Sequence, residues 1–228
     1  NQWRGSVYEY FRNDKLDANN PINKANGLPR SLLRQNQFGV TAGGYIVKDK
    51  IFVFGNYEGN RVREGTGAFG SNVPTAEQRA GILRYRDAND NPQVLNVGIN
   101  RTSQAILRDF IPLPNTPTAN STLYLADGIQ KIDEDAFSVR GDAYLSKKDI
   151  FSARYSYDNQ RQFYPFDIFF VSASLPAFPF PNPEKRTSLA ASYTRIFTSK
   201  LINEFRFGLN YQENPIPSGT TIDPASIG

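Results

Sequence analysis

The sequence contains no cysteine, no histidine and no methionine. Without cysteine the chain has no disulfide and no thiol nucleophile, and without histidine it lacks the commonest metal ligand and general base. It also has no run of about 18 apolar residues, which excludes a membrane-spanning helix. Any catalysis would have to use carboxylates, lysine, tyrosine or serine, so we expect no enzymatic activity, no metal and no cofactor.

The composition differs from that of an ordinary globular domain. Hydrophobic residues make up 39% of the chain, against a usual share of about 45–50%. Aromatic residues still reach 13%, and the net charge is +4. Aromatic and basic residues interleave in proteins that bind single-stranded nucleic acid, but here the lysines and arginines are dispersed rather than clustered. We therefore expect no nucleic-acid partner.

Apolar and polar side chains alternate along several stretches of the chain. Since side chains point to opposite faces of a strand in turn, these stretches predict a sheet with one apolar and one polar face. The apolar positions include Phe137, Val139, Leu145, Phe151, Tyr155, Phe205, Phe207 and Leu209. The polar positions between them include Arg140, Asp142, Arg154, Asp158, Glu204 and Arg206. What covers the apolar face decides the class of protein.

The alternation predicts seven strands of 10 to 13 residues. This length exceeds the usual 5–6 residues of globular strands and matches the roughly 9–11 that a tilted strand needs to cross a bilayer. The predicted strands are Gln2–Asn13, Gln37–Val47, Lys50–Val62, Ala136–Leu145, Ile150–Gln160, Ser188–Phe197 and Leu201–Gln212.

The connections between these strands are alternately long and short. The long connections are 14–36, 63–135 and 161–187, and the short ones are 48–49, 146–149 and 198–200. Outer-membrane barrels show this asymmetry, with short periplasmic turns and longer extracellular loops. The fold class that we predict is therefore all-β, an antiparallel up-and-down transmembrane β-barrel segment. Lipid would contact its apolar face, and the polar face would line the lumen.

Two short helices are predicted in the longest connection. Thr75 is suited to cap a helix that starts at residue 76, with Gln78 completing a capping box. A second helix is predicted over Ser103–Phe110. The proline-rich stretch 178–183 is expected to be irregular, because proline lacks the N–H that a strand ladder uses.

Two polar clusters are candidates for catalysis or for metal binding. Asp133, Glu134 and Asp135 could supply the acid and base of a glycosidase, but a solvated junction between loop and strand is the simpler interpretation. Asp87 opens a stretch that resembles the start of a calcium loop, yet Pro92 and Gly98 replace the required glycine and glutamate. A polar turn is therefore expected there.

Four stretches resemble the first barrel strands of Oar-like TonB-dependent receptors. They are 5–18, 36–50, 51–59 and 73–81, which include Tyr8-Glu9-Tyr10-Phe11-Arg12 and Val73-Pro74-Thr75-Ala76. The resemblance implies a barrel of about 22 strands that is filled by an N-terminal plug and driven by TonB. It implies uptake of a large or scarce solute without catalysis, although relatives are also linked with surface export.

This resemblance assigns residues 1–214 to the first part of such a barrel and residues 215–228 to the start of a further extracellular loop. We expect the chain to be a piece of a longer protein. The implied partners are outer-membrane lipid, the plug, the remaining strands, the TonB complex and an unidentified solute. The polar residues that would face the lumen or contact the plug are Arg140, Asp142, Arg154, Asp158, Glu204 and Arg206.

A soluble secreted β-sandwich that binds carbohydrate through tyrosine and tryptophan is the alternative from another class. It predicts a second sheet packed over the apolar face, with a core shared between the two sheets. The two hypotheses therefore differ in what surrounds Phe137, Val139 and their neighbours.

Overall fold

A computed structural model describes residues 2–19, 21–25, 29–67, 69–116, 121–166 and 175–215 together with Pro217. Contacts divide the chain into two compact units. The sheet unit comprises residues 1–64, 131–163 and 182–216, and the loop unit comprises 65–130, 164–181 and 217–228. Apart from Pro215 and Pro217, the predicted final loop lies outside the described residues.

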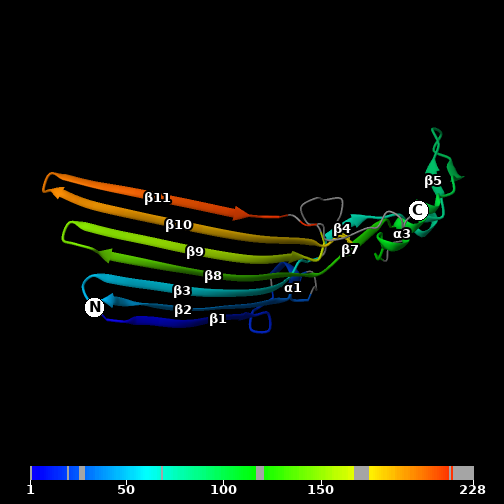
Figure 1. The fold of residues 1–228 in the computed structure, drawn as a ribbon. Helices are drawn as coiled ribbons and strands as arrows, with labels where there is room; N and C mark the ends of the chain where they lie inside the picture. The colour runs from blue at the N-terminus through cyan, green and yellow to red at the C-terminus, as the bar shows by residue number, and fades with distance from the viewer. Residues whose placement is uncertain are drawn as a thin grey trace. The chain divides into compact units, whose positions relative to one another are not determined.

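Seven long strands form the main sheet (Figure 1) in the order β1-β2-β3-β8-β9-β10-β11. The pairs β1–β2, β2–β3, β8–β9 and β10–β11 are antiparallel. The strands are β1 (Arg4–Asn13), β2 (Leu33–Val47), β3 (Ile51–Gly65), β8 (Ile129–Tyr144), β9 (Asp149–Tyr164), β10 (Phe180–Thr198) and β11 (Leu201–Glu213). Each of the seven predicted ranges overlaps one of these strands.

Several strands continue further into the long connections than predicted. β8 begins at Ile129 rather than at Ala136, and β3 continues to Gly65. In these extensions charged residues occupy both faces in place of the apolar and polar alternation. The hydrophobic pattern therefore predicts a shorter strand than the backbone pairing forms.

The expectation for the proline-rich stretch was wrong, because β10 begins at Phe180 and includes Pro181 and Pro183. β11 pairs with β10 only from Lys185 onward, so these prolines lie where that side of the strand has no partner from β11. They are two residues apart, and their missing N–H groups therefore face the same edge. Proline is tolerated at the start of a strand and along such an edge.

The register separates two faces of the sheet. Phe137 lies opposite Tyr157 and Val139 lies opposite Tyr155, whereas Ser138 lies opposite Ser156. In the last hairpin Leu189 is paired with Leu209 and Ser192 with Arg206. We call these the apolar face and the polar face.

The loop unit is built from two small antiparallel sheets and two helices. β4 (Phe69–Asn72) pairs with β7 (Leu123–Ala126), and β5 (Ile82–Arg86) pairs with β6 (Pro92–Asn96). The helices are α2 (Ala76–Arg79) and α3 (Arg101–Asp109). Sequence analysis predicted both helices but neither small sheet. A further short helix, α1 (Pro21–Ala25), lies between β1 and β2 and was also not predicted. Within the described residues, no helix is long and apolar enough to cross a membrane.

Both helices of the loop unit begin with a capped turn. The Thr75 hydroxyl accepts from the Gln78 backbone N–H at 3.3 Å, and the Gln78 amide accepts from the Thr75 N–H at 2.9 Å. This is the predicted capping box. Asn100 caps α3 by accepting from the Ser103 N–H at 2.7 Å.

Arg79 joins these two helices. Its guanidinium donates to the carbonyls of Pro74 (3.1 Å), Leu107 (2.7 Å) and Ile111 (2.6 Å), and also to that of Pro112. Leu107 lies in the last turn of α3, where carbonyls lack helical partners and a cation is favourable. Partial burial lowers the pKa of Arg79. One side chain thus ties α2 to the end of α3.

Candidate functional site: the polar face of the sheet

Hydroxyl and amide side chains form a row across the polar face. The row consists of Ser6, Thr41, Asn56, Ser138, Ser156, Ser188 and Asn210. Ser6 and Thr41 are 2.7 Å apart, and the Ser138 hydroxyl donates to the Asn56 amide oxygen at 2.6 Å. Two pairs of the row are therefore hydrogen-bonded across strands, and the register places the other members beside them on the same face, so the row is a continuous polar surface.

The six predicted polar-face residues take part in short polar contacts along this face. Three pairs are i,i+2 neighbours on one strand: Arg140–Asp142 (2.8 Å), Arg206–Glu204 (2.8 Å) and Arg154–Ser156 (3.1 Å). Asp158 on β9 pairs across strands with Arg186 on β10 at 3.3 Å. Residues two apart share a face, so these contacts agree with the register.

Four of the six residues surround one open hollow. Arg140, Arg154, Glu204 and Arg206 line it together with Ser152 and Ser192. Asp142 lies beside a neighbouring hollow instead, near Arg4 and Thr41, and Asp158 lines neither of these two hollows. Arg140 is paired with Asp142 and Arg206 with Glu204, so the excess of positive charge in the first hollow is a single charge on Arg154; we call this hollow the basic hollow. It is suited to contact an anionic solute group or carboxylates of a protein surface.

Sequence analysis missed a contact that spans three strands of this face. The Tyr8 hydroxyl on β1 donates to the Glu58 carboxylate on β3 at 2.5 Å. The ring crosses Gly39 on β2, where an added Cβ would come within 2.5 Å of the tyrosine ring. Glycine at position 39 therefore leaves the path that the tyrosine needs. The alternation of β1 gave no sign of a partner two strands away.

The acidic cluster was expected at a junction between loop and strand, and this was wrong. Residues 133–135 lie inside β8. Arg61 pairs with Asp135 at 2.6 Å and Arg63 pairs with Asp133 at 2.8 Å, while Tyr57 also donates to Asp135 at 2.6 Å. Both aspartates therefore serve cross-strand ion pairs with β3. The signal that could have revealed them is the spacing of two residues between Arg61 and Arg63 and between Asp133 and Asp135.

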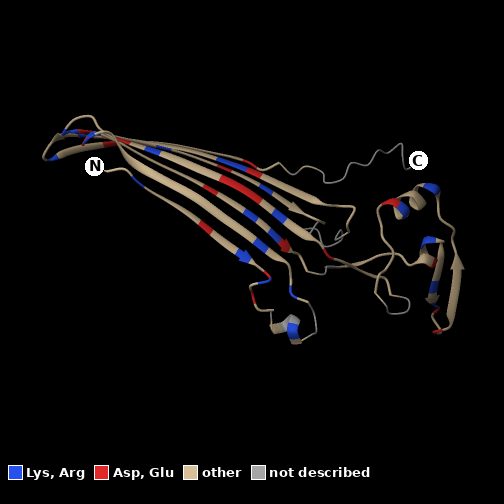
Figure 2. Cartoon of the chain, turned by 90° about the horizontal axis from the view of Figure 1, so that it is seen from below, with Lys and Arg blue, Asp and Glu red and all other residues tan. Residues whose placement is uncertain are grey.

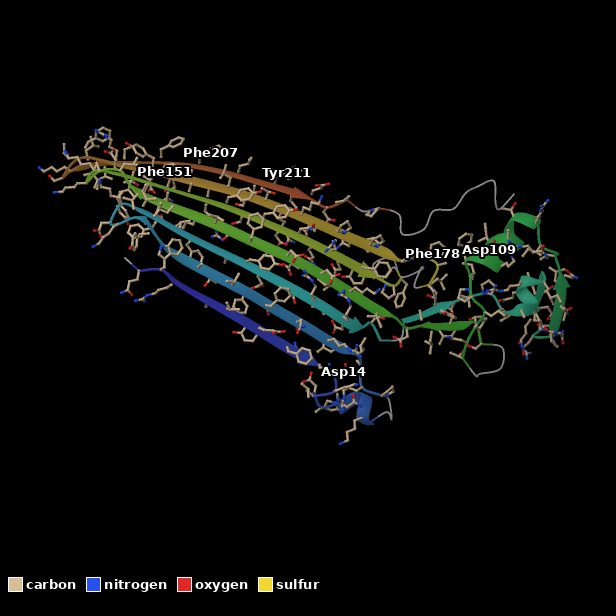
Figure 3. The ribbon with its side chains drawn as sticks, turned by 60° about the horizontal axis from the view of Figure 1, so that its bottom comes forward. Asp14, Asp109, Phe151, Phe178, Phe207 and Tyr211 are labelled. Atoms are coloured by element: carbon tan, nitrogen blue, oxygen red, sulfur yellow. The ribbon has the colours of Figure 1, made fainter. Side chains whose placement is uncertain are left out.

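The apolar face carries the eight predicted apolar residues. All are exposed, from 39% for Phe137 to 64% for Leu145. Figure 3 shows the side chains on the strands, with Phe151, Phe207 and Tyr211 labelled along the sheet. The carbohydrate-binding sandwich required a second sheet over this face. Among the described residues this face is exposed instead, which contradicts that alternative.

Asp87 forms the polar turn between β5 and β6. Its carboxylate accepts from the backbone N–H groups of Asn91 (3.0 Å) and Asn89 (2.9 Å) and from the Gln93 amide (3.0 Å). The bond from the Asn91 backbone is the main cause that lowers the pKa of Asp87. Its oxygens are occupied by the turn itself. In the described part of the chain, no group of three or more acidic side chains is placed to hold a metal ion.

Comparison with known proteins gives one match. The family model described as "Outer membrane beta barrel domain" matches residues 1–228. A search of curated proteins found no match, and neither did a search of solved structures. The antiparallel sheet with an exposed apolar face and a continuous polar face fits this family. The chain belongs to the outer membrane beta barrel domain family, and its location is the bacterial outer membrane, as an integral β-barrel protein.

Proposed function

We propose that this chain forms part of the wall of a TonB-dependent receptor, which takes up a large or scarce solute without altering it chemically. The observation that carries the proposal is the polar face. Its row of hydroxyl and amide groups crosses seven strands, and the basic hollow lies beside that row. A barrel that is wide enough to hold a plug needs a polar interior of this kind.

The connections support the same proposal. The tight turns are at Lys48–Lys50, Ser146–Asp149 and Thr198–Lys200, and every long connection leaves the sheet from the other end. In outer-membrane barrels the long loops are extracellular. The largest part of the loop unit, residues 65–130, lies within the longest connection, and it would therefore meet solute before the barrel interior does.

The plug is the partner that we assign to the basic hollow. In Oar-like receptors, which stretches 5–18 and 36–59 resemble, a plug precedes the barrel strands. A carboxylate of the plug would pair with Arg154, which among the described residues has no acidic partner, whereas Arg140 and Arg206 are already paired with Asp142 and Glu204. The lumen would then be filled by contacts between the wall and the plug, as in a protein interface, and not by water, as in an open pore.

The test uses the full-length protein with a photo-crosslinking amino acid at Ser156 on the polar face. The matched control carries the same amino acid at Val139 on the apolar face of the adjoining strand. We expect the Ser156 variant to crosslink to the region of the chain that precedes residue 1, and the Val139 variant to crosslink only to lipid. Crosslinking of neither variant to protein would contradict a plugged barrel.

A second measurement separates a receptor from a passive porin. In a planar bilayer with potassium chloride, a plugged receptor should show no steady open-pore conductance, and purified TonB periplasmic domain should bind it. A steady conductance without TonB binding would instead support a porin. That result would overturn the TonB part of the proposal and leave the outer-membrane location unaffected.

A further inference from the structure

The apolar face of the sheet ends in a charged zone near the long connections. The last row that is apolar or aromatic on β2, β3, β8 and β9 alike runs through Tyr57 and Phe137, and beyond it single aromatic rings such as Phe38 and Phe163 stand among charged residues; we call this row the last apolar row. Beyond it the same face carries five cations on β2, β3, β8 and β9, which we call the cationic rim: Arg34, Arg61, Arg63, Lys131 and Arg161. Figure 2 shows charged stretches on neighbouring strands near the ends that lead into the long connections.

Two cations of the rim are already neutralised. Arg61 pairs with Asp135, and Arg63 pairs with Asp133. The Arg61 guanidinium also lies 5.7 Å from the centre of the Phe38 ring, and Phe38 lies opposite Glu9 of β1 in the register. The ion pairs and the aromatic contact hold the side chains of Arg61 and Arg63 in place.

The remaining cations exceed the available carboxylates. Arg34 lies directly opposite Arg63 in the register, an arrangement that is destabilising for like charges. Lys131 contacts the Phe163 ring at 5.7 Å, and in the described residues neither it nor Arg34 has an acidic partner within 4.0 Å. Arg161 lies opposite Asp133, which Arg63 already engages. On these four strands five cations face two aspartates, an excess of three positive charges, which Glu9 on the same face of the neighbouring β1 lowers to two.

The position of the rim in the membrane indicates what balances this excess. Arg61 and Arg63 lie four and six residues beyond Tyr57 on β3. At about 3.3 Å per residue and a strand tilt near 40°, this places them roughly 10–15 Å beyond the last apolar row along the membrane normal. They are on the side of the long loops, at the depth of the outer-leaflet headgroups.

We propose that the cationic rim binds the phosphate groups of an anionic glycolipid in the outer leaflet. Arg34 and Lys131 supply the charges that Asp133 and Asp135 leave free. Arginine binds phosphate through paired hydrogen bonds, and basic residues next to a membrane attract anionic lipid. The phosphate would also relieve the repulsion between Arg34 and Arg63. This site lies outside the barrel and requires neither solute uptake nor TonB.

The experiment places the full-length protein in phosphatidylcholine nanodiscs with increasing amounts of bisphosphorylated lipid A and counts bound glycolipid by native mass spectrometry. The test variant is Arg34→Gln/Lys131→Gln. The matched control is Arg4→Gln/Arg12→Gln, which removes two cations from the polar face of β1. We expect the test variant to bind lipid A about tenfold more weakly and the control to bind like the wild type.

Unmodified protein provides a second comparison in case the test variant does not fold. Wild-type protein should retain lipid A and lose most of this binding when the lipid is dephosphorylated. Equal binding of both lipids would overturn the proposal, and so would equal losses in the test and control variants. If inorganic phosphate displaced the lipid at the same concentration, the rim would be a general anion site and not a headgroup site. None of these outcomes depends on TonB, so failure here leaves the proposed function untouched.

Discussion

The two units of this protein differ in the side chains that they bury most completely. In the loop unit Val73, Ala126 and Phe166 are at most 3% exposed. In the sheet unit Ser138 is 7% exposed, while Val139, the next residue on the same strand, is 46% exposed. On this central strand the sheet thus covers a hydroxyl better than the hydrocarbon beside it. Such an arrangement is stable only if hydrocarbon surrounds the apolar face.

This contrast indicates that water surrounds the loop unit and that lipid surrounds the apolar face of the sheet unit. The loop unit has capped helices, a small core and a central arginine that satisfies carbonyls, all of which suit water. The sheet has paired backbone groups and an apolar exterior, which suits lipid, where unsatisfied backbone groups cost several kcal/mol. A change that is harmless in one solvent should be costly in the other.

The largest expected effect comes from placing arginine on an exposed valine in each unit. Val139 of β8 and Val94 of β6 are 46% and 59% exposed. Val139→Arg should cost about 2–4 kcal/mol, because a cation on the lipid face near the bilayer centre is poorly solvated. Val94→Arg should change stability by less than about 0.5 kcal/mol, as surface changes in water do. Urea unfolding of the full-length protein from lipid vesicles measures both.

A third variant sharpens this comparison within the sheet. Ser156→Arg adds the same charge to the polar face, one residue from Tyr155, which lies opposite Val139. It should be tolerated far better than Val139→Arg. If Val139→Arg destabilised the protein as little as Val94→Arg and Ser156→Arg do, both faces of the sheet would meet water, and the assignment of lipid to the apolar face would be wrong.

The next effect concerns the side chain that holds the loop unit together. Arg79→Leu removes the donor for four carbonyls, and we expect a local loss of about 2–3 kcal/mol. Hydrogen exchange of residues 101–113 in the full-length protein should rise about 30-fold or more, with exchange in the sheet unchanged. Arg84→Leu is the matched control. Its ion pair with Glu77 is exposed, so its removal should cost less than about 1 kcal/mol.

The sheet was predictable because lipid imposes a strict alternation of apolar and polar side chains. Phe137 and Val139 on β8 and Phe205 and Phe207 on β11 occupy every second position of an uninterrupted stretch. Where the strands leave the apolar zone, as at Ile129–Asp135, charged residues occupy both faces, and a hydrophobic pattern no longer detects the strand. The capping box at Thr75 was predictable since it is a local contact three residues apart.

The contacts of the candidate site were less accessible from sequence. The i,i+2 pairs such as Arg140–Asp142 follow from strand periodicity alone. The pairs Tyr8–Glu58 and Arg61–Asp135 depend on register between strands that are 50 and 74 residues apart in the chain. Periodicity fixes the face of a residue but not its neighbour on the next strand. The loop unit depends on one residue, Arg79, whose four partners lie up to 33 residues away.

A smaller effect is expected from a change that closes the path of Tyr8. Gly39→Ala would place Cβ about 2.5 Å from the tyrosine ring and 2.8 Å from the Tyr57 carbonyl oxygen. Because backbone lies on one side, we expect a cost of about 1–3 kcal/mol from crowding. Gly208→Ala, where no atom lies within 4 Å, is the control and should be nearly neutral. If both changes proved neutral in urea unfolding, the close contact at Gly39 would not exist.

The smallest effect is a pH dependence of the loop unit. Arg84 lowers the pKa of Glu77, the Asn91 backbone N–H lowers that of Asp87, and Arg108 lowers that of Asp109. A lowered folded-state pKa stabilises the folded form above the ordinary carboxyl value near 4, and this stabilisation is lost as the pH falls through the lowered values. The protection of residues 76–109 against hydrogen exchange, relative to the intrinsic exchange rate at each pH, should therefore fall modestly below about pH 4. Glu77→Gln should reduce the pH dependence, whereas protection in the β1–β2 pair should stay constant. An equal change in β1–β2 would mean that the two units unfold together rather than separately.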